Sequence, residues 1–384
     1  MPSTLPPHFA AATADQEWQW IIRSPGRINI IGEHTDYNGG LVFPAAIDSA
    51  IFFAARTISG TKLKLTALDI NQSAEVPPLT DSPTGQQWVD YLLGICQEFT
   101  KLGHRIPALE IVFGGNLPSG SGMSSSAALE GGMAFLLNTC TSAGLDRPAL
   151  AQLCKRSSNH FMGIPSGIMD QFASLNGQAD KALVLDCNSL EFEAVPAKLD
   201  GYQLVLLNSK VTHDLVHSEY PTRVRECQTG FSAIQAQFPE VESLCQASLE
   251  QLTAVKDQID EVVFRRCYFA IAEQQRVLEA AKALKASDAF RLGNLLNQTH
   301  AGLRDDYQVS CEEVDFLQQF AQDHPAVAGS RIMGGGFGGC TINLVQEAAV
   351  EDFVTAAQAA YLRKYKIEAP VYYVSPAMGT EVLS

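Results

Sequence analysis

Near its N-terminus the chain reads Ser24-Pro25-Gly26-Arg27-Ile28-Asn29-Ile30-Ile31-Gly32-Glu33-His34-Thr35-Asp36-Tyr37-Asn38-Gly39-Gly40. The apolar run at residues 28–31 predicts a buried strand. This strand would bring Glu33, His34 and Asp36 to one of its ends, where functional side chains often lie. A solvated loop could carry the same charges. The buried strand instead favours a site whose cation, carboxylates and imidazole grip the hydroxyls of a polar small molecule.

A second segment reads Leu117-Pro118-Ser119-Gly120-Ser121-Gly122-Met123-Ser124-Ser125-Ser126-Ala127-Ala128-Leu129-Glu130. It follows a predicted strand and opens a predicted helix, where backbone N–H groups and the helix dipole attract phosphate. The hydroxyls of residues 124–126 can bond phosphate oxygens or Mg²⁺. A serine-capped helix is the simpler alternative, but three serines exceed what a cap needs. The segment lacks the lysine of a Walker A loop, so it predicts a phosphate site of another kind.

A lone carboxylate lies in the run Gly167-Ile168-Met169-Asp170-Gln171-Phe172, among apolar and small residues. A buried carboxylate must be paired or have a raised pKa. Capping a helix is one interpretation of Asp170. The other is catalytic, because a cation such as Arg27 beside it would keep it ionised and able to accept a hydroxyl proton.

A glycine cluster, Gly334-Gly335-Gly336-Phe337-Gly338-Gly339, formally matches the G-x-G-x-x-G pattern. A strand-like run at residues 341–345 follows it, where a dinucleotide-binding fold requires a helix, so the dinucleotide interpretation fails. Two interpretations stay equally open: a tight turn packed against a neighbouring backbone, and a loop that closes over a nucleotide.

Composition limits the class of protein. The net charge of −15, from 27 basic and 42 acidic residues, argues against general binding to nucleic acid or to an anionic membrane. No apolar run approaches the roughly 18 residues of a membrane span, and residues 1–19 lack the features of a signal peptide. The nine cysteines form no C-x-x-C pair, which is typical of reduced thiols in the cytoplasm. We therefore expect a cytoplasmic protein.

The pattern along the chain predicts a mixed fold. Apolar and alternating runs predict strands, and helical periodicity predicts helices. The predicted strands are 51–57, 61–67, 109–113, 184–185, 204–207, 341–345 and 371–374, and the helices are 88–102, a helix starting after 122, and much of 222–295, most clearly 265–284. The first ~15 residues read as a mobile arm. We predict an α+β protein of two closely packed lobes, residues 1–200 and 201–384, whose last strand could return to the first lobe.

In this order the segments resemble those of the GHMP kinases, a superfamily named for galactokinase, homoserine kinase, mevalonate kinase and phosphomevalonate kinase. Residues 26–40 are similar to the galactokinase signature almost letter for letter, whereas other members keep the phosphate loop but not this stretch. Three further runs are galactokinase-like: Gly167-Ile168-Met169-Asp170-Gln171, Ser218-Glu219-Tyr220-Pro221-Thr222-Arg223 and Leu303-Arg304-Asp305-Asp306-Tyr307-Gln308-Val309-Ser310.

The resemblance implies a two-lobed GHMP kinase fold with its active site in the cleft between the lobes. It implies ATP-dependent phosphorylation of α-D-galactose at the anomeric hydroxyl to galactose 1-phosphate, the first committed step of galactose catabolism in the Leloir pathway. The implied ligands are galactose, ATP and Mg²⁺, with no nucleic acid and no membrane. We expect a monomer and leave an oligomer open.

The resemblance also implies residue roles. Arg27 matches the arginine that stabilises the transition state, and Asp170 matches the proposed base. The residues that match sugar contacts are Glu33, His34, Thr35, Asp36, Gly167 and Tyr220. Those that match the ATP phosphate loop are Gly120, Ser121, Gly122, Met123, Ser124, Ser125 and Ser126, and Ser126 also matches a magnesium ligand.

One position departs from the family pattern. Galactokinases usually carry a glutamate that helps to hold magnesium at the position where this chain has Ser158. A neutral hydroxyl is a poorer magnesium ligand than a carboxylate. Three interpretations stay open: water fills the position, another carboxylate such as Glu130 substitutes, or metal binding is weakened. Ser158 is kept as the aligned metal position.

Two alternative functions remain. A catalytically silent sensor of galactose and ATP is supported by Ser158, but the intact residues 124–128 and Asp170 argue against it. A kinase for a related sugar, such as N-acetylgalactosamine or arabinose, is the other alternative. The intact run from Glu33 to Asp36 favours galactose, although the size of the pocket depends on residues outside these motifs.

Overall fold

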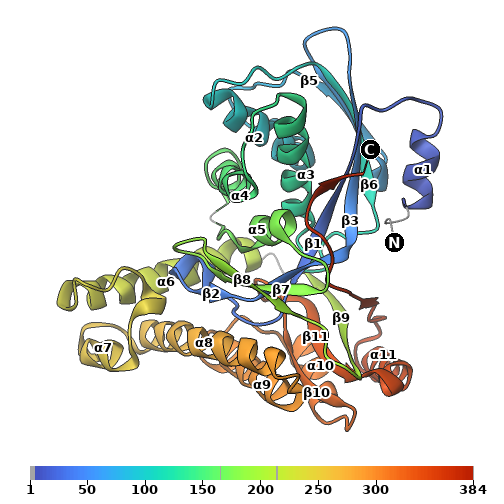
Figure 1. Ribbon diagram of the computed structural model, residues 1–384. Coiled ribbons are helices and arrows are strands. Elements are labelled where there is room, and N and C mark those ends of the chain that lie inside the picture. The colour runs from blue at the N-terminus through green and yellow to red at the C-terminus, as the bar shows by residue number, and fades with distance from the viewer. Residues whose placement is uncertain (1–4, 165, 213–214, 384) are drawn as a thin grey trace.

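The computed structural model describes residues 5–164, 166–212 and 215–383, and its two α+β halves pack against each other (Figure 1). The first half contains a six-stranded sheet with the order β13-β1-β3-β6-β4-β5. Its pairs are antiparallel except for β4 and β6, which run parallel. The strands are β1 (Trp20–Asn29), β3 (Pro44–Thr57), β4 (Leu63–Ala67), β5 (Gln72–Val76), β6 (Leu109–Gly115) and β13 (Glu381–Val382).

Successive side chains of a strand point to opposite faces of the sheet. In this sheet, helices pack on both faces. Phe53 of β3 belongs to the main core beneath the helices, whereas Phe52 packs on the other face against Phe9. The helices on the Phe53 side are α2 (Gln87–Lys101), α3 (Ser125–Cys140), α4 (Arg147–Arg156) and α5 (Met169–Asn176). Phe9 lies in α1 (Pro7–Thr13) and is fully buried. The prediction of a mobile N-terminal arm is therefore wrong for this segment.

The second half contains an antiparallel four-stranded sheet with the order β10-β11-β9-β12. These strands are β9 (Tyr202–Thr212), β10 (Val327–Ile332), β11 (Gly338–Gln346) and β12 (Val371–Tyr373). Its helices are α6 (Leu215–Gln237), α7 (Leu249–Ala254), α8 (Glu261–Lys285), α9 (Ala289–Asp305), α10 (Glu312–Gln322) and α11 (Val350–Tyr365). A three-stranded sheet of β2 (Leu41–Val42), β7 (Lys181–Asp186) and β8 (Phe192–Pro196) lies between the two larger sheets (Figure 1).

The strands and helices predicted from periodicity are confirmed, with shifts at their ends. The run at 51–57 is the second half of β3, and the run at 265–284 lies within α8. The long helical stretch predicted at 222–295 is divided into α6, α7, α8 and the start of α9. The strand β11 begins within the glycine cluster, at Gly338, which confirms that this cluster does not open a helix.

The two halves share one hydrophobic core. The main core joins Ile28 and Phe53 of the first half to Val277 of α8 and Ile342 of β11. The last strand, β13, returns to pair with β1. We keep the division near residue 200 as a proposal, supported by the separate six-stranded and four-stranded sheets. Within the described ranges, none of the helices is both long and apolar enough to cross a membrane.

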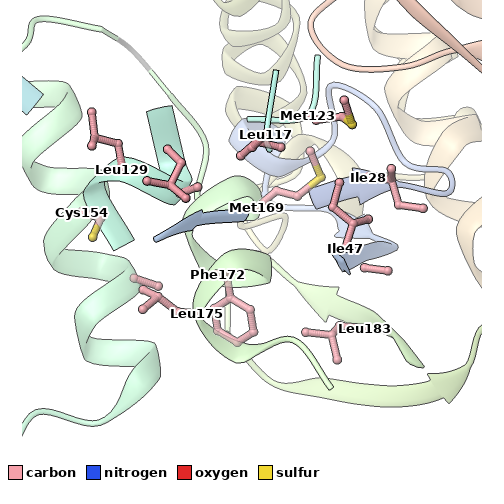
Figure 2. Close-up of a cluster of buried hydrophobic side chains, with 14 of the residues drawn as sticks. Ile28, Ile47, Leu117, Met123, Leu129, Cys154, Met169, Phe172, Leu175 and Leu183 are labelled. Carbon is pink, nitrogen blue, oxygen red and sulfur yellow. The ribbon is translucent and has the colours of Figure 1, made fainter. Parts of the chain in front are cut away.

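The part of the core nearest the candidate site holds its backbone in place. Figure 2 shows Leu117 and Met123, from the predicted phosphate loop, in one cluster with Ile28 of β1 and Met169 of α5. Close-packed side chains of this kind have little freedom to move. The cluster therefore fixes the phosphate loop, β1 and α5 relative to one another, and these segments carry the polar residues described next.

Candidate active site

A cavity of about 390 Å³ lies beside the end of β1, the start of α5 and the glycine loop after β10. Most of the polar side chains that the sequence analysis singled out line it. These are Arg27, Glu33, His34, Asp36, Ser126, Ser158, Asp170 and Tyr220, together with the backbone of Gly167. The fold therefore brings together in one cavity segments that are far apart in the sequence.

Arg27 and Asp170 form an ion pair with two hydrogen bonds in the cavity wall. Nε of Arg27 donates to Oδ1 of Asp170 at 2.8 Å, and Nη2 donates to Oδ2 at 2.7 Å. Nη1 of Arg27 donates to the carbonyl of Gly122, and the hydroxyl of Ser124 donates to Asp170. The structure thus joins the two residues expected to carry the chemistry and ties both to the phosphate loop. Their roles stay predictions.

Glu33 is held by Arg331, a fully buried side chain of β10. Nη1 of Arg331 and the N–H of Gly334 both donate to Oε1 of Glu33, each at 2.9 Å. Arg331 also donates to the carbonyls of Asn29 and Ile30. A buried guanidinium needs partners of this kind. Arg331 therefore fixes the end of β1 and orients Glu33 at the cavity wall.

His34 is a neutral ring held by tyrosines. Its backbone has φ of 62°, and its Nδ1 lies 2.8 Å from the hydroxyl of Tyr37. Burial and then the charge of Arg223 lower the pKa of His34 to about 3, and the Gly335 backbone offsets this only in part. Nε2 has no hydrogen-bond partner among the described residues. This nitrogen can therefore donate to or accept from a ligand hydroxyl in the cavity that His34 lines.

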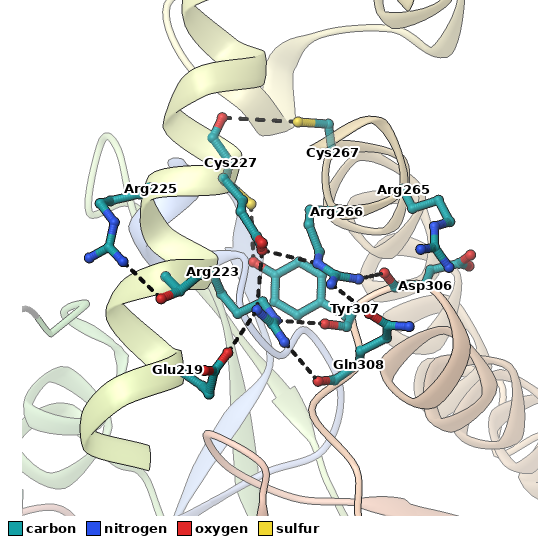
Figure 3. A network of polar contacts seen from close by, with 12 residues as sticks. Glu219, Arg223, Arg225, Cys227, Arg265, Arg266, Cys267, Asp306, Tyr307 and Gln308 are labelled. Carbon is teal, nitrogen blue, oxygen red and sulfur yellow. Dashed lines mark hydrogen bonds and ion pairs between the residues drawn. The ribbon is translucent and has the colours of Figure 1, made fainter. Parts of the chain in front are cut away.

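A polar network around Tyr307 supports the ring of His34. The ring of Tyr307 lies 4.7 Å from that of His34, and its hydroxyl lies 2.7 Å from the hydroxyl of Tyr37. Figure 3 shows Tyr307 at the centre of the network, beside Arg223 and Arg266. Nε of Arg223 donates to the Tyr307 carbonyl at 2.8 Å. The network therefore links α6 and α8 to the segment that carries His34.

Tyr220, on α6, completes the aromatic wall. Its ring lies 5.6 Å from that of His34 and 5.4 Å from that of Tyr37. Burial, followed by the charge of Asp36, raises the pKa of Tyr220. Its hydroxyl therefore stays protonated at neutral pH and can bond a ligand oxygen.

Asp36 and Gly167 touch so closely that a side chain at position 167 has no room. A Cβ atom on Gly167 would lie 1.5 Å from Oδ2 of Asp36. The backbone of Gly167 and the carboxyl of Asp36 therefore form one surface of the cavity, and the position of either depends on the other.

We predict that Gly167→Ala raises the KM for the expected sugar substrate about tenfold to a hundredfold, because overpacking of about 1–3 kcal/mol must displace the Asp36 carboxyl. Initial rates with varied sugar at saturating ATP measure this effect. Gly131→Ala is the matched control, since its new Cβ would meet its nearest atoms at 3.5 Å. An equal rise in the KM for ATP would contradict the assignment of this surface to the sugar.

The ionisation of Asp36 predicts a pH dependence of stability. Burial, followed by the charge of Asp170, raises the pKa of Asp36 to about 7. The unfolded carboxyl titrates near pH 4, so the folded chain binds more protons between about pH 4 and pH 7, and stability falls as pH rises through this window. Asp36→Asn removes this loss. Urea unfolding should show that the variant gains stability relative to the parent as pH rises to 7. A gain that is equal at all pH values would contradict the raised pKa.

Thr35 is not among the residues that line the cavity, and its predicted sugar contact stays a prediction. Thr35 is fully buried, and its hydroxyl donates to the carbonyls of Gly32 and Leu41, at 3.0 and 2.7 Å. A hydroxyl engaged with two backbone carbonyls holds the shape of the loop that carries Glu33 and Asp36.

The predicted phosphate loop presents backbone more than side chains. Gly120 and Gly122 have φ of 70° and 76°, and Ser124 has φ of 57°, so the chain turns sharply before α3 begins at Ser125. Within the described part of the chain, no side chain caps the N-terminus of α3. The first N–H groups of this helix therefore remain available to an anion.

Several of the loop side chains contact other protein groups, and the predicted phosphate contacts of these residues stay predictions. The hydroxyl of Ser121 donates to the carbonyl of Pro118, and Met123 packs into the core. The hydroxyl of Ser124 donates a hydrogen bond to Oδ2 of Asp170. These residues can therefore offer a phosphate group only their backbone, whereas Ser126 lines the cavity.

Ser158, the position aligned with a family metal ligand, lies in the cavity wall and contacts the buried side chain of Glu130. Oγ of Ser158 donates to Oε1 of Glu130 at 2.6 Å, and Nε2 of Gln171 donates to Oε2 at 3.2 Å. Burial raises the pKa of Glu130 to about 7, although both hydrogen bonds oppose the shift. No group of three or more His, Cys, Asp or Glu residues could hold a metal ion in the described ranges.

Several residues of the site were not assigned a role from the sequence, among them Arg331, Tyr307 and Gln171. Gln171 and Tyr307 lie within galactokinase-like runs, and Arg331 lies just before the glycine cluster. The signal that could have found Arg331 is a charged residue within an otherwise strand-like run. Its partners lie in β1 and Glu33, so only the folded chain reveals what it does.

Comparison with known proteins supports the resemblance to galactokinases found in the sequence. The galactokinase galactose-binding signature matches residues 8–57, the GHMP kinase N-terminal domain matches residues 90–178, and the GHMP kinase C-terminal domain matches residues 280–363. A galactokinase from Clostridium perfringens is 38% identical over 361 residues, covering 93% of each chain. One from Thermotoga neapolitana is 37% identical, covering 94% of this chain and 99% of its own length.

Comparison with solved structures indicates the same family and fold. The crystal structure of Lactococcus lactis galactokinase complexed with galactose matches with a TM-score of 0.92 and 36% identity, covering 98% of each chain. A mevalonate kinase structure matches with a TM-score of 0.66 and 17% identity, which shows the shared fold alone. The predicted two-lobed GHMP kinase fold is thereby confirmed. The chain belongs to the galactokinase family of the GHMP kinases.

Proposed function

We propose that this protein is a galactokinase that transfers the γ-phosphoryl group of ATP to the anomeric hydroxyl of galactose, yielding galactose 1-phosphate and ADP. The observation that carries the proposal is the Arg27–Asp170 pair in one cavity with the sugar segment and Ser126. Phosphoryl transfer depends on positioning and on charge neutralisation more than on covalent catalysis. A cation and a carboxylate held together suit this chemistry.

The sugar end of the site is formed by Glu33, His34, Asp36 and Tyr220. Carboxylates accept from sugar hydroxyls, while the tyrosine hydroxyl and a neutral imidazole can donate or accept. With the sugar held by these groups, its reacting hydroxyl would lie against Asp170, which accepts the proton. A site built from such partners rejects analogues that lack or misplace a hydroxyl.

The nucleotide end of the site is formed by the start of α3. The phosphates of ATP would lie against the N–H groups of the first helical turn and the hydroxyl of Ser126. Arg27 bonds both Asp170 and the Gly122 carbonyl of this loop, so its charge lies between the two substrates. Such a charge stabilises the transferring phosphoryl group in the transition state.

Magnesium fits the oxygen groups at this end. Ser126 and Ser158 line the cavity, and Oε1 of Gln171 is a buried acceptor without a hydrogen-bond partner among the described residues. We propose Ser126 and Ser158 as residues that hold the cation. Bound with ATP, Mg²⁺ neutralises phosphate charge.

We also place the protein in the cytoplasm. All nine cysteines are free thiols, which suits a reducing compartment. The monomeric state stays a prediction.

A coupled ADP-release assay with galactose and MgATP tests the proposed function. We expect turnover that requires the sugar. Tight binding of galactose and ATP without turnover would instead identify a silent sensor. Relative kcat/KM values for galactose, N-acetylgalactosamine and arabinose decide the sugar, and the proposal requires galactose to have the highest value.

A further inference from the structure

The position of the Glu33 carboxyl depends on two segments of the chain. The loop after β1 carries Glu33 itself, and the segment that ends β10 carries its two donors, the side chain of Arg331 and the N–H of Gly334. A binding group keeps its geometry only while the segments that hold it keep theirs. Each of the two segments is bonded by a buried side chain of α8 or α9 that is not among those that line the cavity.

Glu273 of α8 anchors the loop that carries Glu33. It is fully buried, and its Oε1 accepts from the N–H of Gly32 at 2.9 Å. Other donors hold the carboxylate in turn: Nε of Arg276 donates to Oε2 at 2.5 Å, and the hydroxyl of Thr299 lies 3.1 and 2.9 Å from the two oxygens. A buried carboxylate needs partners of this kind, and bonds to a charged group are strong. Glu273 therefore fixes the backbone one residue before Glu33.

His300 of α9 anchors the end of β10. Its side chain is buried, and Nδ1 accepts from the N–H of Ile332 at 3.1 Å. A ring nitrogen that accepts from a backbone N–H carries no proton, so a neutral ring has its proton on Nε2. Nε2 lies 3.2 Å from Oδ1 of Asp315, which also accepts from the hydroxyl of Ser310. The ring therefore has a fixed orientation, in which it holds the peptide group that follows Arg331.

We propose that Glu273 and His300 are positioning residues for sugar recognition, which hold Glu33 where it accepts from a sugar hydroxyl and do not touch the sugar themselves. The proposal rests on the proposed function, in which Glu33 belongs to the sugar end of the site. Thr299 and His300 are consecutive in α9, so one helix connects the loop that carries Glu33 with the strand that donates to it. A buried ion pair adds little stability over apolar side chains of similar volume, so stability alone does not account for a carboxylate at position 273.

The test compares galactose with its 2-, 3-, 4- and 6-deoxy derivatives at saturating MgATP. A site that bonds a hydroxyl rejects the sugar that lacks it, so the ratio of kcat/KM for galactose to that for each deoxy sugar measures how strongly one hydroxyl is recognised. Glu33→Gln identifies the hydroxyl that Glu33 contacts, because a neutral amide bonds it more weakly than a carboxylate. We expect Glu273→Gln and His300→Leu to lower the same ratio about tenfold or more, since a displaced group loses its contact. The other ratios and the KM for ATP should stay at the parental values.

Two further variants separate positioning from packing. Glu98→Gln is the matched control, because Glu98 is also a buried carboxylate that accepts from Nε of an arginine, Arg156, and it does not line the cavity. It should keep every ratio. His300→Asn is the rescue variant, because its Oδ1 can replace Nδ1 as the acceptor for Ile332, and it should restore the ratio that His300→Leu loses. If Glu273→Gln fails to fold, as judged by circular dichroism melting, the two variants of His300 decide.

The outcomes distinguish this proposal from the proposed function. Parental ratios in a folded Glu273→Gln or His300→Leu variant overturn the positioning role, and so does an equal fall in all ratios, because the cause would then be a general loss of structure. A Glu33→Gln variant that changes no ratio also overturns it. If the parent protein lacks galactose-dependent turnover, the proposed function fails, and dissociation constants of the same sugars from calorimetry decide the positioning role. A parent that binds none of these sugars overturns both.

Discussion

We expect Asp170→Asn to lower galactose-dependent ADP release about 10²- to 10⁴-fold, which is the usual contribution of a general base. The amide keeps the shape of the carboxylate and can still accept from Arg27, so the cavity should remain formed. It cannot take the proton of the attacking hydroxyl. ATP affinity should be unchanged, because Asp170 lies at the sugar end of the Arg27 contact. Stopped-flow or coupled assays give turnover, and calorimetry gives ATP affinity.

Asp146→Asn is the matched control for this prediction. Asp146 accepts from the N–H of Ala149 at the start of α4, and asparagine caps a helix equally well. This control should have the turnover of the parent. If Asp170→Asn loses ATP binding in proportion to turnover, Asp170 is a structural residue that holds Arg27 and Ser124.

The sequence predicted the parts of this site that depend on local pattern. The apolar run before Glu33 predicted a buried end of β1, and the glycines before Ser124 predicted a turn into α3. Both follow from rules that act over a few residues. They predicted Glu33, His34 and Asp36 at the end of a strand and Ser126 near the start of a helix, without any knowledge of long-range contacts.

Long-range partners could not be predicted in this way. Arg331 bonds Glu33 across most of the chain, and Tyr307 supports His34 from the other half. Neither contact produces a periodic pattern in the sequence, because each depends on how two sheets and their helices pack. Burial of Phe9 against Phe52 could not be predicted either, because no pattern near residue 9 indicates that its side chain packs on the face of a sheet.

The pattern of glycines and serines at a helix start predicted a phosphate loop but not which of its atoms face a ligand. From the sequence, the hydroxyls of Ser121 and Ser124 were expected to bind phosphate. The folded loop turns them toward Pro118 and Asp170 instead. Left-handed backbone at Gly120 and Gly122 decides this orientation, because it determines where each following side chain points.

Arg27→Ala lowers turnover by about 10³-fold or more, the range found for arginines that stabilise phosphoryl-transfer transition states. The guanidinium contacts Asp170 at the sugar end and Gly122 at the nucleotide end, so its charge lies where the transferring group must pass. Galactose affinity should change much less, because Glu33, Asp36 and their supports are untouched. A kcat that falls while the galactose dissociation constant stays near its parental value is the expected result.

The control for Arg27 is Arg56→Ala, which removes an ion pair with Glu110 in the same sheet and away from the cavity. Arg27→Ala also breaks an ion pair, and its stability loss should be smaller than the about 3–5 kcal/mol of a fully buried pair, because the Asp170 side chain is 32% exposed. A loss confined to galactose affinity would identify Arg27 as a binding residue.

The double variant Arg27→Ala with Asp170→Asn tests whether the pair acts as a unit. Groups that act in one step give non-additive losses. The double variant should therefore be barely slower than the slower single variant. Losses that multiply would mean that Arg27 and Asp170 act in separate steps, and the hydrogen bonds between them would then serve only to hold the cavity together.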